Sequence, residues 1–460
     1  MARSVDPPES GPDASGRPTR ILPLGQLVRL SLYWLGLSSI FAGLNVILQG
    51  RLVFTGLVPP EQVGTALILT QVGGALIAIL VQPTVGTISD YTISRWGRRK
   101  PYIFLGSVLD VVFLYLIATA ETIPALAVFI ILLQISSNFA QGPFQGYVPD
   151  LVPAPQVGLA SALVGLFQIL GNVVGFLIGS AAVALSASDP NAFFYGLLAL
   201  GVLELATMIS LVVRVDEGRP PRPRGGRSWL DVAKEAWGTD ILAERSYLFL
   251  VASRLFVLVG ATILVNLGVV YLAQSHGLAE EATGRTTALI AGIIALMTML
   301  AVVPSARASD RFGRKRVIYV SCAVGTVGLA IVVVAPSVPV ALVGAAFVGV
   351  SSGIFLAVDW ALLTDIIPKA TTGRYMGISN VATASSGIVA LVAGGLILDV
   401  VNVTVEFGLG PRAALAFGIV SYLIGALLLR PVDERRREDA PVPAVLAVGA
   451  APGGRGSEAG

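Results

Sequence analysis

The sequence predicts an all-α membrane protein with twelve transmembrane helices arranged as two related six-helix halves. Its 460 residues are 55% hydrophobic and only 13% charged, whereas a soluble domain typically has about 25% charged residues. The mean hydropathy of +0.80 agrees with a surface that faces mostly lipid. The net charge of +3 gives no basic footprint for nucleic acid, so we expect a lipid bilayer as the main partner and no nucleic acid.

Twelve apolar runs are long enough to cross the hydrocarbon core as helices, which takes about 20 residues. Because lipid leaves free backbone groups unsatisfied, each run is expected to be helical. The runs are 28–50, 63–86, 101–120, 124–148, 158–186, 192–213, 246–273, 284–306, 317–335, 337–363, 375–400 and 412–430.

The distribution of Lys and Arg predicts the orientation. Twenty-seven of these residues fall in the two termini and in the loops on the same face, while the opposite face holds Arg51, Arg285 and Arg412. By the positive-inside rule, both termini are expected in the cytoplasm of a multi-pass plasma-membrane protein.

The same pattern divides the chain into five parts. A polar stretch rich in Pro, Gly and Asp is expected to be a disordered cytoplasmic N-terminus, and a Pro, Gly and Ala-rich stretch a disordered tail. A basic, Pro-rich cytoplasmic linker joins the halves. The parts are 1–22, the N-terminal half 23–213, the linker 214–245, the C-terminal half 246–430 and the tail 431–460.

Cys322 and His276 are the only cysteine and histidine. One of each excludes an internal disulfide and a Cys/His zinc cluster, and no Ser/Asp arrangement lies near His276 for a catalytic triad. We therefore expect no enzyme activity, no metal and no cofactor.

Two loop motifs recur in register along the chain. Ser89-Asp90 followed by Arg95-x-Gly97-Arg98-Arg99 matches Ser309-Asp310 followed by Arg311-x-Gly313-Arg314, with the aspartates 220 residues apart. Asp150 and Asp365 head a second repeated segment, 215 residues apart. These matches predict two parallel copies related by an axis along the membrane normal.

A tight Gly turn brings helix ends together, where Asp and Arg side chains form charge-assisted pairs. We predict that such pairs lock the cytoplasmic face while the outer face is open, and break when the halves rock. The alternative is that the arginines only fix topology and bind lipid phosphates. The predicted gating residues are Gly86, Asp90, Arg95, Gly97, Arg98, Arg99, Asp150, Asp310, Gly313, Arg314 and Asp365.

At these residues the chain resembles the major facilitator superfamily, whose loop signature is Gly-x-x-x-Asp followed by Arg-x-Gly-Arg-Lys/Arg. Residues 81–151, from Val81-Gln82-Pro83 to Asp150-Leu151, are similar to the sucrose:proton symporters and the wider glycoside–pentoside–hexuronide:cation symporter group. The resemblance implies a major facilitator fold and uptake of a sugar or glycoside with protons, driven by the proton gradient.

The chain departs from that group at two positions. The family's Asp and Arg in the fourth span are replaced by Gln134 and Gln145, so the family's coupling and binding roles do not carry over there. The paired aspartates that bind cations in melibiose-type relatives are not evident in span two, so sodium coupling is not supported.

Amide side chains on the spans are the candidate substrate ligands, because polar groups in hydrocarbon face a cavity or a partner helix. Amides donate and accept hydrogen bonds, which suits sugar hydroxyls, although they also bond helices to each other. Four of them share one face of span four at i, i+4, i+7 and i+11. The candidates are Gln134, Asn138, Gln141 and Gln145, with Asn45, Gln49, Gln168, Asn172 and Asn266.

Four ionisable residues lie within spans: Asp110, Glu204, Arg254 and Asp359. A carboxyl that is removed from water can bind and release a proton, as a proton-coupled carrier requires. We favour Asp359, beside the aromatic Trp360, as the proton or substrate carboxylate. Asp110 and Glu204 follow as coupling candidates or structural partners, and Arg254 either pairs with a carboxylate or reaches toward the cytoplasm.

We therefore predict a monomeric secondary transporter that moves a small solute, a sugar or glycoside with protons, by alternating access. The alternatives are an exporter of drugs or another metabolite with the same fold and, more remotely, a non-transporting membrane sensor or scaffold.

Overall fold

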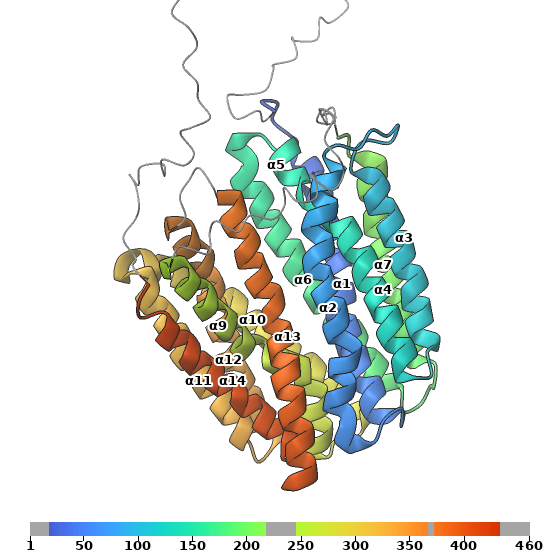
Figure 1. The fold of residues 1–460 in the computed structure, drawn as a ribbon, viewed down its shortest axis with the longest axis vertical. Coiled ribbons are helices and arrows are strands. Elements are labelled where there is room, and N and C mark those ends of the chain that lie inside the picture. The colour runs from blue at the N-terminus through green and yellow to red at the C-terminus, as the bar shows by residue number, and fades with distance from the viewer. Residues whose placement is uncertain (1–17, 218–244, 367–371, 433–460) are drawn as a thin grey trace, which may run out of the picture.

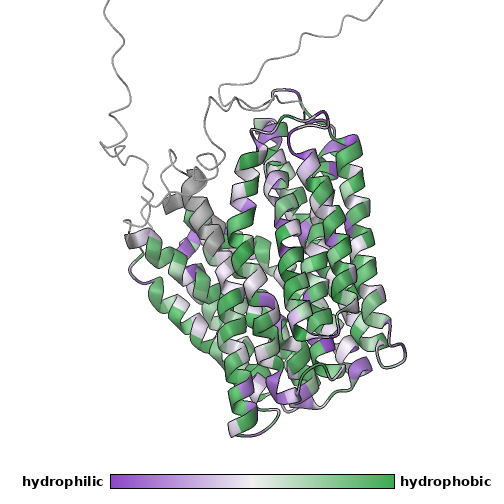
Figure 2. Cartoon of the chain, turned by 45° about the vertical axis from the view of Figure 1, so that its right-hand side comes forward, coloured by the Kyte–Doolittle hydropathy of each residue, from purple (hydrophilic) through white to green (hydrophobic). Residues whose placement is uncertain are grey.

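The computed structural model describes residues 18–217, 245–366 and 372–432. In this part of the chain twelve helices are long and apolar enough to cross a membrane. Figure 2 shows hydrophobic residues along the helix walls and hydrophilic residues gathered toward the two ends. The predicted fold class is confirmed, since the described residues are almost entirely helical and contain no strand.

The N-terminal half is a bundle whose fourth span ends in a short separate helix after Pro143. Its elements are α1 (Leu24–Phe54), η1 (Pro60–Gln62), α2 (Val63–Ser89), α3 (Lys100–Thr119), α4 (Ile123–Gln145), α5 (Tyr147–Leu151), η2 (Ala154–Gln156), α6 (Val157–Leu185) and α7 (Ala192–Arg214).

The C-terminal half is the second bundle, and the residues between 217 and 245 that join it to the first lie outside the described part. Its elements are α9 (Arg245–Val270), η4 (Tyr271–Ser275), α10 (Glu280–Phe312), α11 (Arg314–Val334), α12 (Val338–Ile366), α13 (Thr372–Thr404) and α14 (Gly410–Leu428). The runs near 317–363 are two helices, because α11 ends before Ala335 and α12 begins at Val338.

The two halves meet at one face of the molecule and diverge toward the other (Figure 1). Their contact face carries the loop between α1 and α2, whereas α5 and the loop between α2 and α3 lie at the opposite face. We call these the closed face and the terminal face. Most of the predicted N-terminal segment, of the linker and of the predicted tail lies outside the described residues.

Candidate functional site

A cavity of about 930 Å³ lies between the halves. It is lined by α1, α2, α4, α5 and α6 on one side and by α9, α10, α12 and α13 on the other. Its walls extend to Leu30 and Tyr147, near the terminal face. A space of this size accommodates a small molecule such as a disaccharide.

One wall of this cavity carries a buried ion pair. A guanidinium nitrogen of Arg254 on α9 lies 2.7 Å from a carboxylate oxygen of Asp359 on α12, and the two side chains are 4% and 7% exposed. Arg254 also donates to the Thr383 hydroxyl on α13, at 3.0 Å. The pair thus holds three helices of the C-terminal half together, and Asp359 is the carboxylate that Arg254 pairs with. The side chain of Trp360 lies outside the described ones.

Amide side chains form the facing wall. Gln141 and Gln145 of α4, with Gln168 and Asn172 of α6, line the cavity opposite Arg254 and Asp359. A charged pair and four amides on one cavity supply both donors and acceptors for a solute rich in hydroxyl groups.

The other two amides predicted to share this face of α4, Gln134 and Asn138, do not line the main cavity. Gln134 lines an adjoining space of about 450 Å³, together with Asn45, Asn172 and Asn266. Asn138 is buried and its amide donates back to the Gln134 carbonyl, at 2.8 Å. Asn138 therefore belongs to the packing of α4, although it shares the helical face of the other three.

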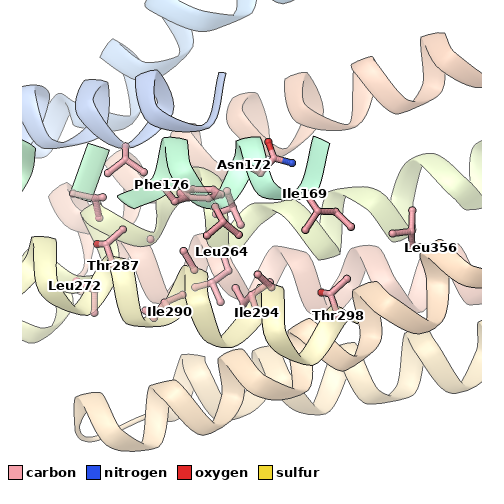
Figure 3. Close-up of a pocket in the computed structure, with 17 residues that line it drawn as sticks. Ile169, Asn172, Phe176, Leu264, Leu272, Thr287, Ile290, Ile294, Thr298 and Leu356 are labelled. Atoms are coloured by element: carbon pink, nitrogen blue, oxygen red, sulfur yellow. The ribbon is translucent and has the colours of Figure 1, made fainter. Parts of the chain in front are cut away.

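A third, mainly apolar space of about 250 Å³ continues between α6, α9 and α10. Figure 3 shows Asn172 and Phe176 of α6 above Leu264, Ile290 and Ile294. Asn172 lines all three spaces, so it lies where the polar and apolar parts join.

The closed face is held by hydrogen bonds between the halves. Gln49 is fully buried, and its side chain donates to the Val265 carbonyl at 3.2 Å and accepts from the Val269 amide at 3.1 Å. Asn45 donates to Asn266 at 3.3 Å. Gln49 thus contacts the partner half but lines none of the three spaces. Asn45 and Asn266 contact each other across the two halves and also line the space of about 450 Å³.

Asp399 near the end of α13 makes a second link at this face. Its carboxylate accepts from the backbone amides of Gly64 and Thr65 at 2.8 and 2.6 Å, and from the Thr65 hydroxyl at 2.7 Å. An acceptor there satisfies free N–H groups at the start of α2 and interacts favourably with the helix dipole. Gly395 allows the close approach, because a Cβ there would lie 2.8 Å from the Gly64 carbonyl oxygen. Asp399 is not among the residues predicted from the sequence, although an aspartate near the end of an apolar span is visible there.

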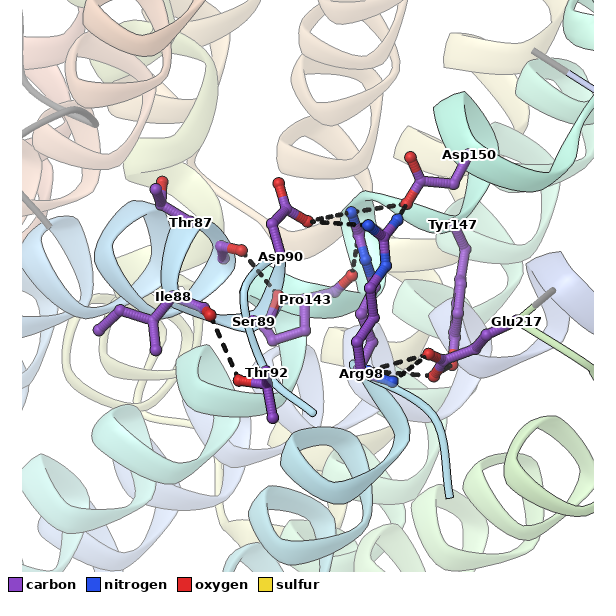
Figure 4. A network of polar contacts seen from close by, with 12 residues as sticks. Thr87, Ile88, Ser89, Asp90, Thr92, Arg98, Pro143, Tyr147, Asp150 and Glu217 are labelled. Carbon is purple, nitrogen blue, oxygen red and sulfur yellow. Dashed lines mark hydrogen bonds and ion pairs between the residues drawn. The ribbon is translucent and has the colours of Figure 1, made fainter. Parts of the chain in front are cut away.

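At the terminal face, the loop after α2 is fixed by ion pairs (Figure 4). A guanidinium nitrogen of Arg99 lies 2.6 Å from both Asp90 and Asp150, and Arg99 also donates to the Pro143 carbonyl at 2.7 Å. Arg98 pairs with Asp150 as well. Gly86 packs against the backbone of α4, whereas Arg95 is exposed. Among the described residues, these pairs connect elements of the N-terminal half.

Glu217, which the sequence places in the predicted linker and not among the candidate site residues, completes the network. Its carboxylate accepts from the backbone amides of Arg98 and Lys100 at 2.6 and 2.7 Å, and from the Tyr147 hydroxyl at 2.8 Å. It thereby caps α3 from the end of α7. A repeat was the available signal: Val215-Asp216-Glu217 recurs as Val432-Asp433-Glu434.

The equivalent loop after α10 has few such contacts in the described residues. Arg314 lies 3.8 Å from Asp310, whose side chain is 73% exposed. Gly97 and Gly313 adopt positive φ angles of 111° and 92°, so both copies turn at the predicted glycine. The side chain of Asp365 lies outside the described ones.

His276 lies just beyond the seventh span and contacts the Tyr271 hydroxyl at 2.9 Å. Burial, with the nearby Arg412, lowers the pKa of His276, so its ring is neutral at pH 7.

Comparisons with known proteins agree with this architecture. The family model described as the Major Facilitator Superfamily matches residues 31–284 and 250–447. A sucrose transport protein of Arabidopsis thaliana is 31% identical over 129 residues, which cover 23% of this chain and 22% of that protein. A human membrane-associated transporter protein is 25% identical over 174 residues, covering 32% of this chain and 33% of that protein. The chain thus spans between about a fifth and a third of these relatives.

Solved structures share the whole fold at low identity. A bacterial homolog of the human lysosomal transporter Spinster, in an inward-facing conformation, has a TM-score of 0.67 and 16% identity, covering 91% of this chain and 98% of that one. A D-xylose-proton symporter has a TM-score of 0.65 and 17% identity, covering 89% and 98%.

Proposed function

Because the chain belongs to the major facilitator superfamily, we propose that it carries a sugar or glycoside across the plasma membrane together with protons, by alternating access. The observation that carries this proposal is the cavity between the halves, with the Arg254–Asp359 pair on one wall and four amides on the other. The matches to sucrose transport proteins, although limited to part of the chain, point to the same class of solute.

The ion pair gives a route to coupling. When Asp359 is ionised it neutralises Arg254, and the two groups satisfy each other. A proton on Asp359 removes this charge and leaves the guanidinium group free to donate to a solute hydroxyl. Binding of the proton and binding of the solute then favour each other, which is the thermodynamic requirement for symport.

The two faces supply the alternating access. With the termini in the cytoplasm, the closed face is extracellular and the cavity faces the cytoplasm. Opening the outer side then requires the contacts of Gln49 and Asp399 with the partner half to break. Both contacts consist of a few hydrogen bonds and bury no ion pair among the described residues, so they suit a reversible closure.

Counterflow in proteoliposomes tests the proposal. Labelled sucrose or maltose should exchange saturably against an internal unlabelled pool and accumulate when the outside is acidic. Asp359→Asn should reduce accumulation at least about tenfold, because it removes the titrating group, while the exposed loop variant Glu61→Gln should match the wild type. Absence of saturable exchange with disaccharides and other glycosides would rule out the sugar as solute.

A second candidate function is export of an apolar drug or metabolite, which the mainly apolar space around Phe176 and Ile290 favours. The same vesicles separate the two proposals. Competition by apolar compounds, together with no effect of disaccharides, would support the exporter.

A further inference from the structure

Two carboxyl groups are buried in the middle of the N-terminal half, away from the three spaces described above. Asp110 lies about halfway along α3 and Glu204 about halfway along α7, and both are 0% exposed. Neither residue lines a cavity among those described, so they are separate from the Arg254–Asp359 pair.

Hydroxyl groups from neighbouring helices donate to these carboxyls. Ser136 and Ser137 of α4 donate to the two different oxygens of Asp110, with Ser137 at 2.7 Å. Tyr33 of α1 donates to Glu204 Oε1 at 3.1 Å and also contacts the Ser107 hydroxyl at 2.7 Å.

Two glycines bring the helices close enough for this arrangement. A Cβ at Gly36, less than one turn after Tyr33, would lie 2.7 Å from the Glu204 backbone, and one at Gly106 would lie 2.7 Å from the Ser136 carbonyl oxygen. Small residues at these crossings allow the polar side chains to meet inside the bundle.

The hydrogen bonding leaves one atom without a donor. Glu204 Oε2 is buried and has no hydrogen-bond partner. The Tyr33 hydroxyl that donates to Glu204 Oε1 also contacts Ser107, which precedes Asp110 by three residues on the same face of α3. The two carboxyls therefore lie on facing sides of the contact between α3 and α7. Among the described residues, the titratable groups facing the cluster are Tyr33 from α1, Asp110 from α3 and Glu204 from α7, with only serines from α4. None of these is a cation, so two ionised carboxylates would be uncompensated here, an arrangement that is strongly unfavourable in a low-dielectric interior.

We propose that Asp110 and Glu204 form a single proton-binding site that holds one proton between two carboxyls. Glu204 is the donor, because both Asp110 oxygens already accept from serines whereas Glu204 Oε2 lacks a partner. The proton therefore sits on Glu204 Oε2 and is donated to Asp110. Similar sharing between close carboxyls makes the two groups titrate as a unit.

The position of the site suggests its use in transport. Tyr33 packs edge-on against Phe144, with ring centroids 4.8 Å apart, and Phe144 lines the main cavity beside Trp34. An aromatic layer thus separates the proton from the cavity. The N-terminal half carries a proton site of its own, opposite the Arg254–Asp359 pair of the C-terminal half. Its use in coupling rests on the proposed function, whereas its existence does not.

Infrared spectroscopy of the purified full-length protein, with no solute added, tests the proposal. A protonated carboxyl gives a carbonyl band, which is identified by its shift in D₂O. Asp110→Asn, Glu204→Gln and the double variant should each lose the same single band, since removing either partner leaves one ionised, hydrogen-bonded carboxylate or none. Glu281→Gln, in an exposed i,i+4 ion pair, should lose none. Two different bands whose losses add in the double variant would mean two protons and overturn the proposal.

No band lost in any variant would mean that both groups are ionised, and would also overturn it. Stabilisation of the wild type but not of the variants by Na⁺ would then identify a cation site. Tyr33→Phe provides a check that keeps both carboxyls: it should shift the frequency of the shared-proton band, because Glu204 loses a hydrogen bond. An unchanged band in a folded Tyr33→Phe protein would contradict the assignment to Glu204.

Discussion

The loops after α2 and after α10 carry the same sequence elements but make different contacts. In the N-terminal copy, Arg98 and Arg99 are buried and bridge Asp90 and Asp150. In the C-terminal copy, the pair between Asp310 and Arg314 is long, and the Asp310 side chain is largely exposed. Both copies keep the positive-φ glycine, so the turn itself is common to the two halves.

Among the described residues, the two loops contact different partners. Glu217 accepts three successive backbone amides of the N-terminal loop, from Arg98 to Lys100. In the C-terminal copy, Lys315 donates to the carbonyls of Arg430 and Val432 at the end of the last helix, and Glu434, the repeat counterpart of Glu217, lies outside the described residues. The N-terminal loop is therefore a fixed part of its half.

Removal of the Glu217 carboxylate should lower the free energy of unfolding more than any other substitution in the two loops. Glu217→Ala leaves three backbone amides without their acceptor, and we expect the free energy of unfolding to fall by about 3 kcal/mol at roughly 1 kcal/mol each. Reversible unfolding in mixed detergent micelles measures this change. Glu281→Ala, which breaks only an exposed ion pair, should stay within about 0.5 kcal/mol of the wild type. Equal losses of stability in the two variants would show that the Glu217 cap does not stabilise the protein.

The two turn glycines give a matched pair of substitutions. Gly313→Ala forces a non-glycine residue to a φ of 92°, which should lower the free energy of unfolding by about 1 kcal/mol. Gly97→Ala carries the same kind of strain, and its Cβ would lie 2.6 Å from a Glu217 carboxylate oxygen. We expect a loss of about 2 kcal/mol there, because the cap must shift. The same unfolding assay measures both, and a larger loss at Gly313 would refute the proposed difference between the loops.

The sequence was sufficient to predict the twelve spans and the two halves, because lipid imposes apolar, helical segments wherever the chain crosses it. The turns at Gly97 and Gly313 were also predictable, since the motif repeats in register. The Val-Asp-Glu repeat marks Glu217 in the sequence, but its contacts were not predictable, because they depend on where the end of α7 meets the start of α3.

The amide residues show the same limit within the spans. Asn45 and Gln49 share one face of α1, yet Gln49 bonds to the backbone of α9 while Asn45 also lines a cavity. Likewise, Asn138 shares a face with Gln134 and Gln141 but bonds to its own helix. Helical spacing identifies a polar face, whereas the crossing of neighbouring helices decides which members of it reach the cavity.

The smallest expected effect on stability is the difference between substitutions of Asp90 and Asp310, the matching aspartates of the two loops. Asp90→Asn weakens a pair between the half-buried Asp90 and the buried Arg99 at 2.6 Å, and we expect the free energy of unfolding to fall by about 1.5 kcal/mol, as for a hydrogen bond to a charged group. Asp310→Asn should change it by less than about 0.5 kcal/mol, because an exposed pair 3.8 Å long is screened by solvent. Chemical unfolding of both variants side by side gives the difference. If Asp310→Asn proved as costly as Asp90→Asn, the C-terminal loop would be as firmly fixed as the N-terminal one.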